Sequence, residues 1–279
     1  MDIADKAEGI IRIALAEDLG PEGDITTNAV CKPDDVGKGQ LVCGEPCTVA
    51  GQPVVARVFA LAGPGASYRQ LVKDGDSAAA GQALGEVEGP LLAVLSGERT
   101  ALNFLCHLSG IATLTARLVV MASPHGVKIM DTRKTMPGLR ILEKYAVSAG
   151  GGTNHRVGLY DGVIIKDNHI IATGGLPVAV RRARNSLGER FPLEVEASTL
   201  VEVRQAVDCG ADIIMLDNME PGQVEQAVAI IGGRAKVEVS GGVNPDNIGS
   251  YLRLGIDFIS LGFITHSAPS VDISLRLAE

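Results

Sequence analysis

The sequence is poor in aromatic residues and in cysteine. Phe, Tyr and Trp together make up 3% of the chain, with no Trp at all, so aliphatic side chains must fill the core of a chain that is 46% hydrophobic. Aliphatic cores of this kind suit parallel sheets covered by helices. The five cysteines are odd in number and show no CxxC spacing, so we expect reduced thiols. Cys43 and Cys47 give only weak evidence for zinc.

The chain also lacks an excess of basic charge and long hydrophobic runs. Its 25 Lys and Arg against 33 Asp and Glu give a formal net charge of −8. Nucleic acids and anionic membranes usually demand a basic face, so we expect neither as a partner. No apolar run approaches the roughly 20 residues of a transmembrane helix, and the N-terminus has no basic, apolar signal region. We therefore expect a cytoplasmic protein. The net negative charge does not exclude small anionic substrates, because their binding depends on local clusters of basic residues.

Up to about residue 95 the pattern indicates a short helix followed by short strands and tight turns. Apolar residues recur at helical spacing from Ile3 to Leu15, which predicts a first helix. A long helical stretch begins at Pro90 and ends near Met121. Between the two helices, the expected strands are 39–43, 47–50 and 67–72, with turns at 73–76 and 85–90.

From residue 127 onward, short β-branched runs alternate with helical segments. The expected strands are 127–131, 162–166, 193–197, 212–217, 236–240 and 258–262, and the expected helices are 139–149, 176–189, 199–209, 221–231 and 245–255. Strand and helix repeated in this order predict a parallel sheet, and six such strands point to an α/β barrel or near-barrel. An open doubly wound sheet is the alternative, but no GxGxxG motif follows the first strand.

Charged residues or glycines stand at the end of every one of these strands. They are Asp131 with Arg133 and Lys134, then Lys166, Glu196, Asp217, Ser240 with Gly241, and Gly262. In parallel α/β barrels the active site forms at this carboxyl edge. We therefore interpret these residues as a candidate active-site rim, not as charges that merely solvate strand ends.

The rim residues fall into two chemical kinds. Glu196 and Asp217 would repel an anionic substrate unless a cation intervened, which indicates Mg²⁺. Glycines after the last two strands let backbone N–H groups approach a phosphate. The basic side chains, which suit carboxylates and phosphates, are Arg133, Lys134, Arg156 and Lys166. The residues alone thus predict transfer of a phosphorylated sugar or a phosphoryl group to or from a polyanionic substrate.

Longer motifs give a more specific result. The runs DTRKTMPGLR (131–140), GGGTNHR (150–156), LYDG (159–162) and IKDNH (165–169) resemble the signature of the quinolinate phosphoribosyltransferases. Further blocks of the same resemblance are EDLG (17–20), GDITT (23–27), ERTALN (98–103), EVE (194–196), LDN (216–218) and THSAP (265–269). Together they span nearly the whole chain. Met136 is the one departure, where a small polar residue is expected.

The resemblance implies a fold and an activity. The fold is α/β, with an incomplete, TIM-like parallel barrel over 111–266 and a smaller N-terminal α/β sandwich domain over 1–110, joined by 267–279. The activity is a decarboxylating pentosyl transfer in de novo NAD biosynthesis. It joins quinolinate to the phosphoribosyl group of phosphoribosyl pyrophosphate and releases nicotinate mononucleotide, pyrophosphate and CO₂. The family also implies a homodimer whose active site is shared between subunits.

The resemblance also assigns roles by position. Arg99 is the arginine donated by the partner subunit, and Glu196 and Asp217 serve the ribose and the metal. Catalytic roles fall to these two acids and to Lys134 and Lys166, either of which is a candidate proton donor. The quinolinate pocket takes Thr132, Arg133, Lys134, His155, Arg156 and Lys166, and the phosphate site takes Ser240, Gly241, Gly262 and His266.

Three other functions share part of this pattern. A homologous protein associated with molybdate transport has the same fold, but we expect it to depart from the IKDNH and LYDG blocks, which are intact here. A non-catalytic phosphate-binding barrel would leave Glu196 and Asp217 without a task. A lipoyl or biotinyl carrier would need a modifiable lysine at a hairpin tip, and only Lys73 comes near one. His107, in an apolar helical stretch, is interpreted as structural.

Overall fold

The structure is a computed structural model that describes residues 2–278. The chain forms two compact units. The first takes in the chain up to Ala116, the segment Lys134–Gly151 and the chain from Phe263 onward; the second takes in Arg117–Arg133 and Gly152–Gly262. Compact units and domains need not share limits, and the domain limits of 1–110 with 267–279 and 111–266 stay a prediction.

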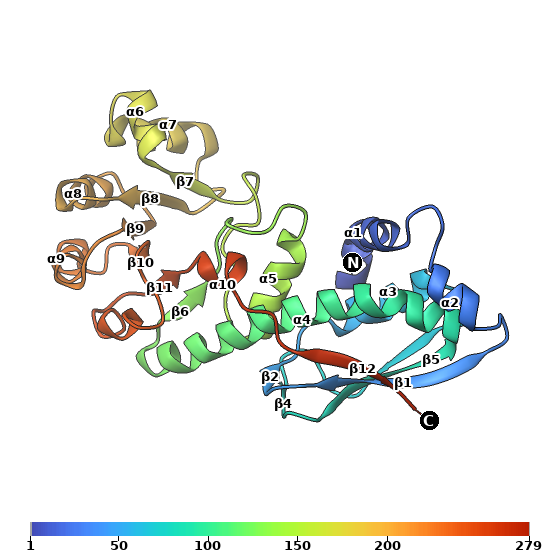
Figure 1. Cartoon of the computed structure of the whole chain (residues 1–279). Helices are drawn as coiled ribbons and strands as arrows, with labels where there is room; N and C mark the ends of the chain where they lie inside the picture. Colours follow the sequence, from blue (N-terminus) through green and yellow to red (C-terminus); the bar gives the residue numbers. More distant parts are fainter. Residues whose placement is uncertain (1, 279) are drawn as a thin grey trace. The chain divides into compact units, whose positions relative to one another are not determined.

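An antiparallel sheet with strand order β12-β1-β5-β3 organises the first unit. Its strands are β1 (Val36–Cys43), β3 (Ser67–Gln70), β5 (Ala83–Pro90) and β12 (Ile273–Leu277), while β2 (Cys47–Thr48) and β4 (Ser77–Ala78) form a separate pair. Its helices are α1 (Ile3–Leu19), α2 (Ile25–Val30), α3 (Gln52–Ala62), most of α4 (Leu91–Ala122), α5 (Arg140–Ala149) and α10 (Phe263–His266). The last strand of the chain pairs with β1, so C-terminal residues complete the N-terminal sheet (Figure 1).

Helix α1 shows why this unit folds as it does. Asp2 caps its first turn by accepting a hydrogen bond from the Ile3 N–H, and Gly20 ends it with a positive φ of 53°. Ala7, Ile11 and Leu15, spaced four residues apart, share one face and are buried. The helix packs against α3. The predicted helix from Ile3 is confirmed.

A parallel sheet forms the second unit, in the order β6-β11-β10-β9-β8-β7. The strands are β6 (Lys128–Met130), β7 (Val163–Ile165), β8 (Leu193–Ala197), β9 (Ile213–Asp217), β10 (Lys236–Ser240) and β11 (Phe258–Ser260); the helices are α6 (Asp167–Thr173), α7 (Leu176–Leu187), α8 (Leu200–Asp208) and α9 (Pro221–Ile231). The first strand pairs with the last, and within residues 2–278 no pairing joins β6 to β7. This is a barrel left open at one place, as predicted.

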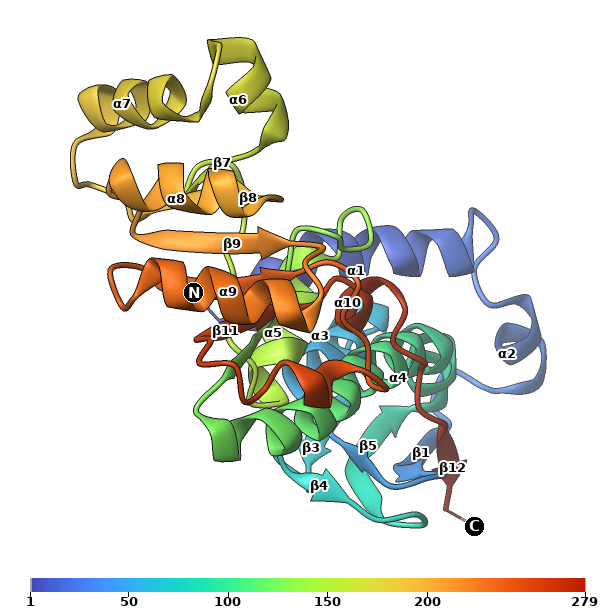
Figure 2. The same ribbon diagram turned by 90° about the vertical axis from the view of Figure 1, so that its left-hand side faces the viewer.

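Helices cover the outside of this barrel, and α7, α8 and α9 lie side by side along it (Figures 1 and 2). The strand register then decides which side chains face the interior. Glu196 and Glu238 both pair with Met215, and Asp217 pairs with Ser240. Paired residues in a sheet share a face, and side chains alternate along each strand. Glu194, two residues before Glu196, therefore joins these residues on the interior face.

Two predicted elements of the chain are wrong. The segment 85–90 is not a turn but the end of strand β5, whose glycines and proline hid an eight-residue strand paired on both sides. The helix expected at 245–255 is only a 3₁₀ turn at Ile248–Ser250, flanked by further turns. Asn244 and Asn247 explain this, because their side chains hydrogen-bond to nearby backbone groups in place of a continued helical ladder.

Helix α4 is long and apolar enough, by length and composition, to cross a membrane. Much of it is buried inside the protein, including Leu105, Leu108 and Ile111, which have no exposed surface. Core helices of soluble proteins pass the same length test. The sequence-based expectation of no membrane partner stays a prediction.

Candidate active site

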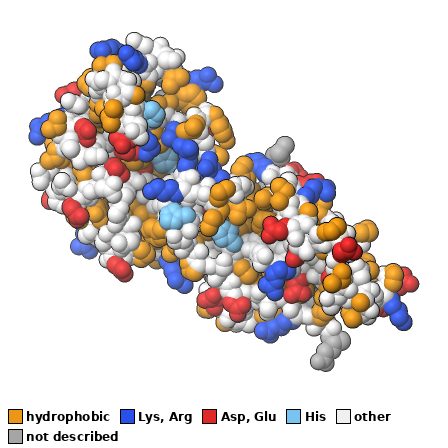
Figure 3. Space-filling view, turned by 45° about the horizontal axis from the view of Figure 1, so that its top comes forward, with side chains coloured by type: hydrophobic (Ala, Val, Ile, Leu, Met, Phe, Trp, Pro, Cys, Tyr) orange, Lys and Arg blue, Asp and Glu red, His pale blue; other side chains and the backbone are white. Residues whose placement is uncertain are grey.

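The carboxyl ends of the barrel strands meet at one edge, and the predicted rim residues of the second unit lie there. Lys166 follows β7, Glu196 lies near the end of β8, and Asp217 and Ser240 end β9 and β10. Gly262 follows β11 by two residues. Cations also gather in one area of the left-hand part of the surface in Figure 3, among His side chains, although the whole chain carries a net charge of −8.

Lys166 and Glu196 form an ion pair across adjacent strands. The Lys166 side chain is 42% exposed and that of Glu196 is 12% exposed, so the pair sits where the barrel interior meets solvent. The backbone of Lys166 is fixed by the first turn of α6, where its N–H donates to His169 Nδ1 at 3.0 Å. The Lys166 backbone is therefore fixed, while its partly exposed ammonium group is held by the ion pair with Glu196.

The turn after β9 holds Asp217 in place. Asn218 adopts a left-handed backbone with φ of 54°, donates its N–H to the Ser240 carbonyl at 2.9 Å, and donates its side-chain amide to Asp217 Oδ2 at 3.0 Å. Gly241 packs directly on this amide: a Cβ built there would lie 2.3 Å from Asn218 Oδ1. Gly241 also has φ of +80°, so both conformation and space require glycine.

Asp131, at the end of β6, proves to be structural. It is fully buried, and its carboxylate accepts a hydrogen bond from the His155 N–H at 2.8 Å. This bond ties the loop before β7 to β6 and leaves Thr132 and Arg133 to extend beyond the strand. Thr132 is half-buried and Arg133 is exposed.

Arg156 is partly buried and feels the charges of Arg133 and of the acids Glu194 and Asp161. Its Nη1 donates to the Gly162 carbonyl at 2.9 Å, and its buried Nε has no hydrogen-bond partner in the described part of the chain. Burial lowers the pKa of Arg156, and the nearby charge of Arg133 lowers it further. An anion beside the Arg156 guanidinium would offset both its burial and its repulsion from Arg133.

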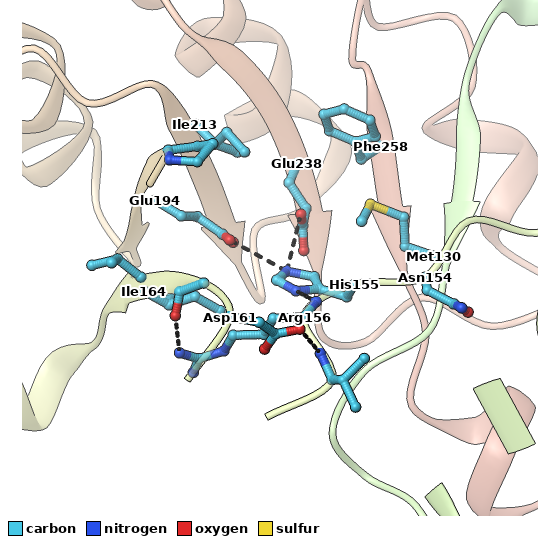
Figure 4. A pocket seen from close by; sticks show the side chains of 14 residues that line it. Met130, Asn154, His155, Arg156, Asp161, Ile164, Glu194, Ile213, Glu238 and Phe258 are labelled. Atoms are coloured by element: carbon cyan, nitrogen blue, oxygen red, sulfur yellow. Dashed lines mark hydrogen bonds and ion pairs between the residues drawn. The ribbon is translucent and has the colours of Figure 1, made fainter. Parts of the chain in front are cut away.

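His155 points into the barrel between two acids (Figure 4). Its Nε2 lies 3.3 Å from Glu194 Oε2 and 3.6 Å from Glu238 Oε2, and both carboxylates are almost fully buried. Burial alone would lower the pKa of His155, but the contacts with Glu194 and Glu238 outweigh it and raise the pKa to about 10. Burial raises the pKa of Glu194. Because His155 Nδ1 accepts a hydrogen bond from the Arg156 N–H, the additional proton that the raised pKa of this histidine implies is shared between Nε2 and the two carboxylates.

These two glutamates were not predicted as site residues. A signal was present in the sequence, because each glutamate stands between two apolar residues of a predicted strand, in Leu-Glu-Val and Val-Glu-Val. Only the strand register shows that both face the same interior. Ser260 was also missed: it pairs with Ser240, and its buried hydroxyl has no partner among residues 2–278.

The cluster of His155, Glu194 and Glu238 borders a cavity of about 420 Å³. Apolar side chains such as Met130, Ile164 and Phe258 line much of it, and it reaches the beginnings of the strands at Pro192 and Ile213. The cavity is therefore the inside of the barrel below the rim. The rim residues Lys166, Glu196, Asp217 and Ser240 do not line it.

Three predicted site residues belong to the first unit. Arg99 is exposed on α4, and His266 is exposed with its Nδ1 2.6 Å from Ser267 Oγ. The carbonyl of Lys134 accepts a hydrogen bond from Thr265 Oγ1 at 2.7 Å, which ties the segment after β6 to α10. His107, interpreted as structural, contacts the buried Glu143 at 3.0 Å.

An open parallel barrel whose carboxyl edge carries cations, carboxylates and glycines is typical of barrel enzymes that act on anionic, phosphate-bearing substrates. The comparisons with known proteins give the particular family. The quinolinate phosphoribosyl transferase N-terminal domain matches residues 24–109, and the C-terminal domain of the same enzyme matches residues 111–276. The chain belongs to the quinolinate phosphoribosyltransferase family.

Relatives and solved structures agree with this assignment. The chain is 42% identical over 264 residues to the probable nicotinate-nucleotide pyrophosphorylase (carboxylating) of Bacillus subtilis, covering 93% of this chain and 89% of the relative. It is 43% identical over 286 residues to the protein of that name from Methanocaldococcus jannaschii, covering 99% of both. The solved nicotinate-nucleotide pyrophosphorylase from Francisella tularensis is 37% identical, with a TM-score of 0.93, covering 99% of this chain and 97% of that one.

Proposed function

We propose that this chain is the decarboxylating quinolinate phosphoribosyltransferase of de novo NAD biosynthesis, a pentosyltransferase. It converts quinolinate and phosphoribosyl pyrophosphate to nicotinate mononucleotide, pyrophosphate and CO₂. Both family domains and relatives over nearly the full chain support the assignment. The observation in the site that carries it is Arg156, whose buried Nε has no hydrogen-bond partner in the described part of the chain and whose guanidinium feels the charge of Arg133. Quinolinate brings two adjacent carboxylates, which match these two cations.

The reaction needs charge and orientation more than covalent chemistry from the protein. The pyridine nitrogen attacks the anomeric carbon as the bond to pyrophosphate breaks. The resulting pyridinium stabilises the carbanion left when the adjacent carboxylate departs as CO₂, and this carbon then takes a proton. Lys134 or Lys166 is the proposed proton donor. Arg133 and Arg156, with Thr132 beside Arg133 in the chain, would hold the acid in position. His155 is assigned to this pocket by family resemblance, and its ring is turned into the barrel (Figure 4).

We assign the phosphoribosyl end to the later strands of the barrel. Ser240, Gly241 and Gly262 offer backbone N–H groups and a hydroxyl after β10 and β11, where barrels commonly bind phosphate. Ser260 adds a buried hydroxyl beside Ser240. His266, placed in this group by family resemblance, lies in the first unit.

The acids of the rim fit Mg²⁺. Glu196 and Asp217 lie on adjacent strands with side chains on the same face, and the Asn218 amide holds Asp217 in a fixed orientation. Mg²⁺ takes one or two carboxylates and fills its shell with phosphate oxygens and water. When bound, the ion would neutralise charge on the departing pyrophosphate. Lys166, paired with Glu196 in this structure, would then be released toward the substrate.

We also propose that the enzyme works as a homodimer in the cytoplasm, with Arg99 of each subunit completing the other subunit's site. The Arg99 side chain is exposed and makes no ion pair with any described residue of its own chain. Five free cysteines, two of them with Sγ atoms 3.3 Å apart, suit a reducing compartment.

Turnover with defined substrates tests the proposed function. The protein is incubated with phosphoribosyl pyrophosphate, Mg²⁺ and either quinolinate or nicotinate, and nicotinate mononucleotide is quantified by chromatography. We expect product from quinolinate and almost none from nicotinate, which lacks the second carboxylate. Turnover of nicotinate without turnover of quinolinate would assign the chain to a different phosphoribosyl transfer.

A further inference from the structure

The loop between α5 and β7 covers the place where the barrel is open. Thr153 forms a parallel bridge with Met130; its N–H donates to the Ile129 carbonyl at 2.8 Å, and its carbonyl accepts from the Asp131 N–H at 3.3 Å. Two residues later, the Asp131 carboxylate holds the His155 N–H. The loop thus follows the free edge of β6 for a few residues and then turns the His155 side chain into the barrel.

Inside the barrel, β8 and β10 supply the two acids that face the His155 ring. Glu194 and Glu238 side chains are 5% and 1% exposed, and each has one oxygen, Oε1, without a hydrogen-bond partner among residues 2–278. Two acids buried in an apolar interior are costly unless a cation or hydrogen bonds compensate them. Nothing in the proposed phosphoribosyl transfer uses either carboxylate directly.

The two ring nitrogens of His155 link these acids to the next residue of the chain. Nε2 faces Glu194 and Glu238, while Nδ1 accepts a hydrogen bond from the Arg156 N–H at 2.7 Å. The ring therefore spans from the barrel interior to the backbone of the arginine. Figure 4 shows the Arg156 side chain turned away from the acids, with its guanidinium bonded to the Gly162 carbonyl.

We propose that Glu194 and Glu238 are positioning residues for quinolinate binding, which fix the His155 ring and, through its contact with the Arg156 backbone, hold Arg156 where it meets a substrate carboxylate. This inference rests on the proposed function. The acids act from inside the barrel, and they do not touch the substrate. After Arg156, the Asp161 carboxylate holds the loop by accepting hydrogen bonds from the Val157 and Gly158 N–H groups. Before Arg156, the buried His155 ring is the side-chain anchor, so the two acids that fix this ring also fix the start of the arginine.

A divalent cation is the competing use of the same three residues, whose ligand atoms lie within 4.8 Å of one another. The contact of Nδ1 argues against it. A histidine that ligates through Nε2 carries its proton on Nδ1, but here Nδ1 accepts a hydrogen bond, which leaves the proton on Nε2. His155 Nε2 is therefore arranged as a hydrogen-bond donor between the carboxylates of Glu194 and Glu238.

Steady-state kinetics of Glu194→Gln, Glu238→Gln and the double variant test the proposal, with Glu225→Gln on the exposed side of α9 as the matched control. We expect the KM for quinolinate to rise by roughly 10- to 100-fold, because small misplacements of a binding group have effects of this size. The KM for phosphoribosyl pyrophosphate should change less than threefold, about 0.6 kcal/mol. A merely structural loss would lower Tm and raise both KM values together, which would overturn the proposal.

A second cycle tests the route through His155. If the acids act through the ring, the effects of Glu238→Gln and His155→Gln on the KM for quinolinate will not add in the double variant. Additive effects would contradict the proposal. The proposal would also be contradicted by a metal ion that is present in stoichiometric amount in the purified enzyme and is lost in Glu194→Gln. Wild-type enzyme that turns over no quinolinate would instead remove the proposed function, so the two failures are distinguishable.

Discussion

Single residues of the rim are constrained by their neighbours in the fold. Gly241 and the adjacent Gly242 both have positive φ, at +80° and +69°. Only Gly241 lies against another side chain, the amide of Asn218, which in turn orients Asp217. Gly242 is therefore required by backbone conformation alone, whereas Gly241 is required by backbone conformation and by its contact with the site residue Asn218.

We predict that Gly241→Ala and Gly242→Ala differ in activity more than in stability. Each forces a left-handed alanine, which costs about 1–2 kcal/mol of unfolding free energy. Gly241→Ala also displaces Asn218, so its kcat/KM should fall by at least about tenfold, or 1.4 kcal/mol. Urea unfolding and steady-state kinetics measure the two effects. Equal losses of kcat/KM in both variants would show that the Asn218 contact does not matter to the site.

The contribution of Arg133 to quinolinate binding can be measured directly. We expect Arg133→Ala to weaken quinolinate binding by about 1.5–3 kcal/mol, the size of a hydrogen bond to a charged group. Calorimetric titration with quinolinate measures the change, and Arg182→Ala on the exposed face of α7 is the matched control. Unchanged affinity in Arg133→Ala would remove this arginine from the pocket.

At the scale of elements, the barrel could be predicted and its interior could not. Short β-branched strands such as 193–197 and 236–240 have a clear local pattern, and all six predicted strands are present. Strand β5 was missed because its glycines and proline mask the alternation of side chains, and pairing with the strands on both sides decides the outcome. Glu194 and Glu238 became site residues only through strand register, which is a long-range property.

Two helical glycines give a prediction about how elements pack. A Cβ at Gly110 in α4 would lie 2.1 Å from the Pro269 carbonyl oxygen, whereas a Cβ at Gly9 in α1 would meet nothing within 4 Å. We expect Gly9→Ala to stabilise the protein by about 0.5–1 kcal/mol through helix propensity. Gly110→Ala should destabilise it, because the segment before β12 must move. Thermal unfolding checks both signs, and a stabilised Gly110→Ala would contradict the packing described.

At the scale of the whole molecule, the proposed dimer makes each site depend on two chains. Arg99→Ala and Lys134→Ala enzymes should each be inactive. In a mixture, heterodimers contain one site with both residues intact, so activity should return to about a quarter of the wild-type value. Mixing Arg99→Ala with the Arg99→Ala/Lys134→Ala double variant is the control and should restore nothing. No recovery in the first mixture would place Arg99 outside a shared site.

The central claim is that one site couples glycosyl transfer to decarboxylation. Quinolinate labelled in the 2-carboxylate, with phosphoribosyl pyrophosphate and Mg²⁺, allows CO₂, pyrophosphate and nicotinate mononucleotide to be counted in one reaction. We predict that the three products appear in equal amounts and that no CO₂ is released when phosphoribosyl pyrophosphate is left out. Release of CO₂ without phosphoribosyl pyrophosphate, or nucleotide formed without CO₂, would contradict the account.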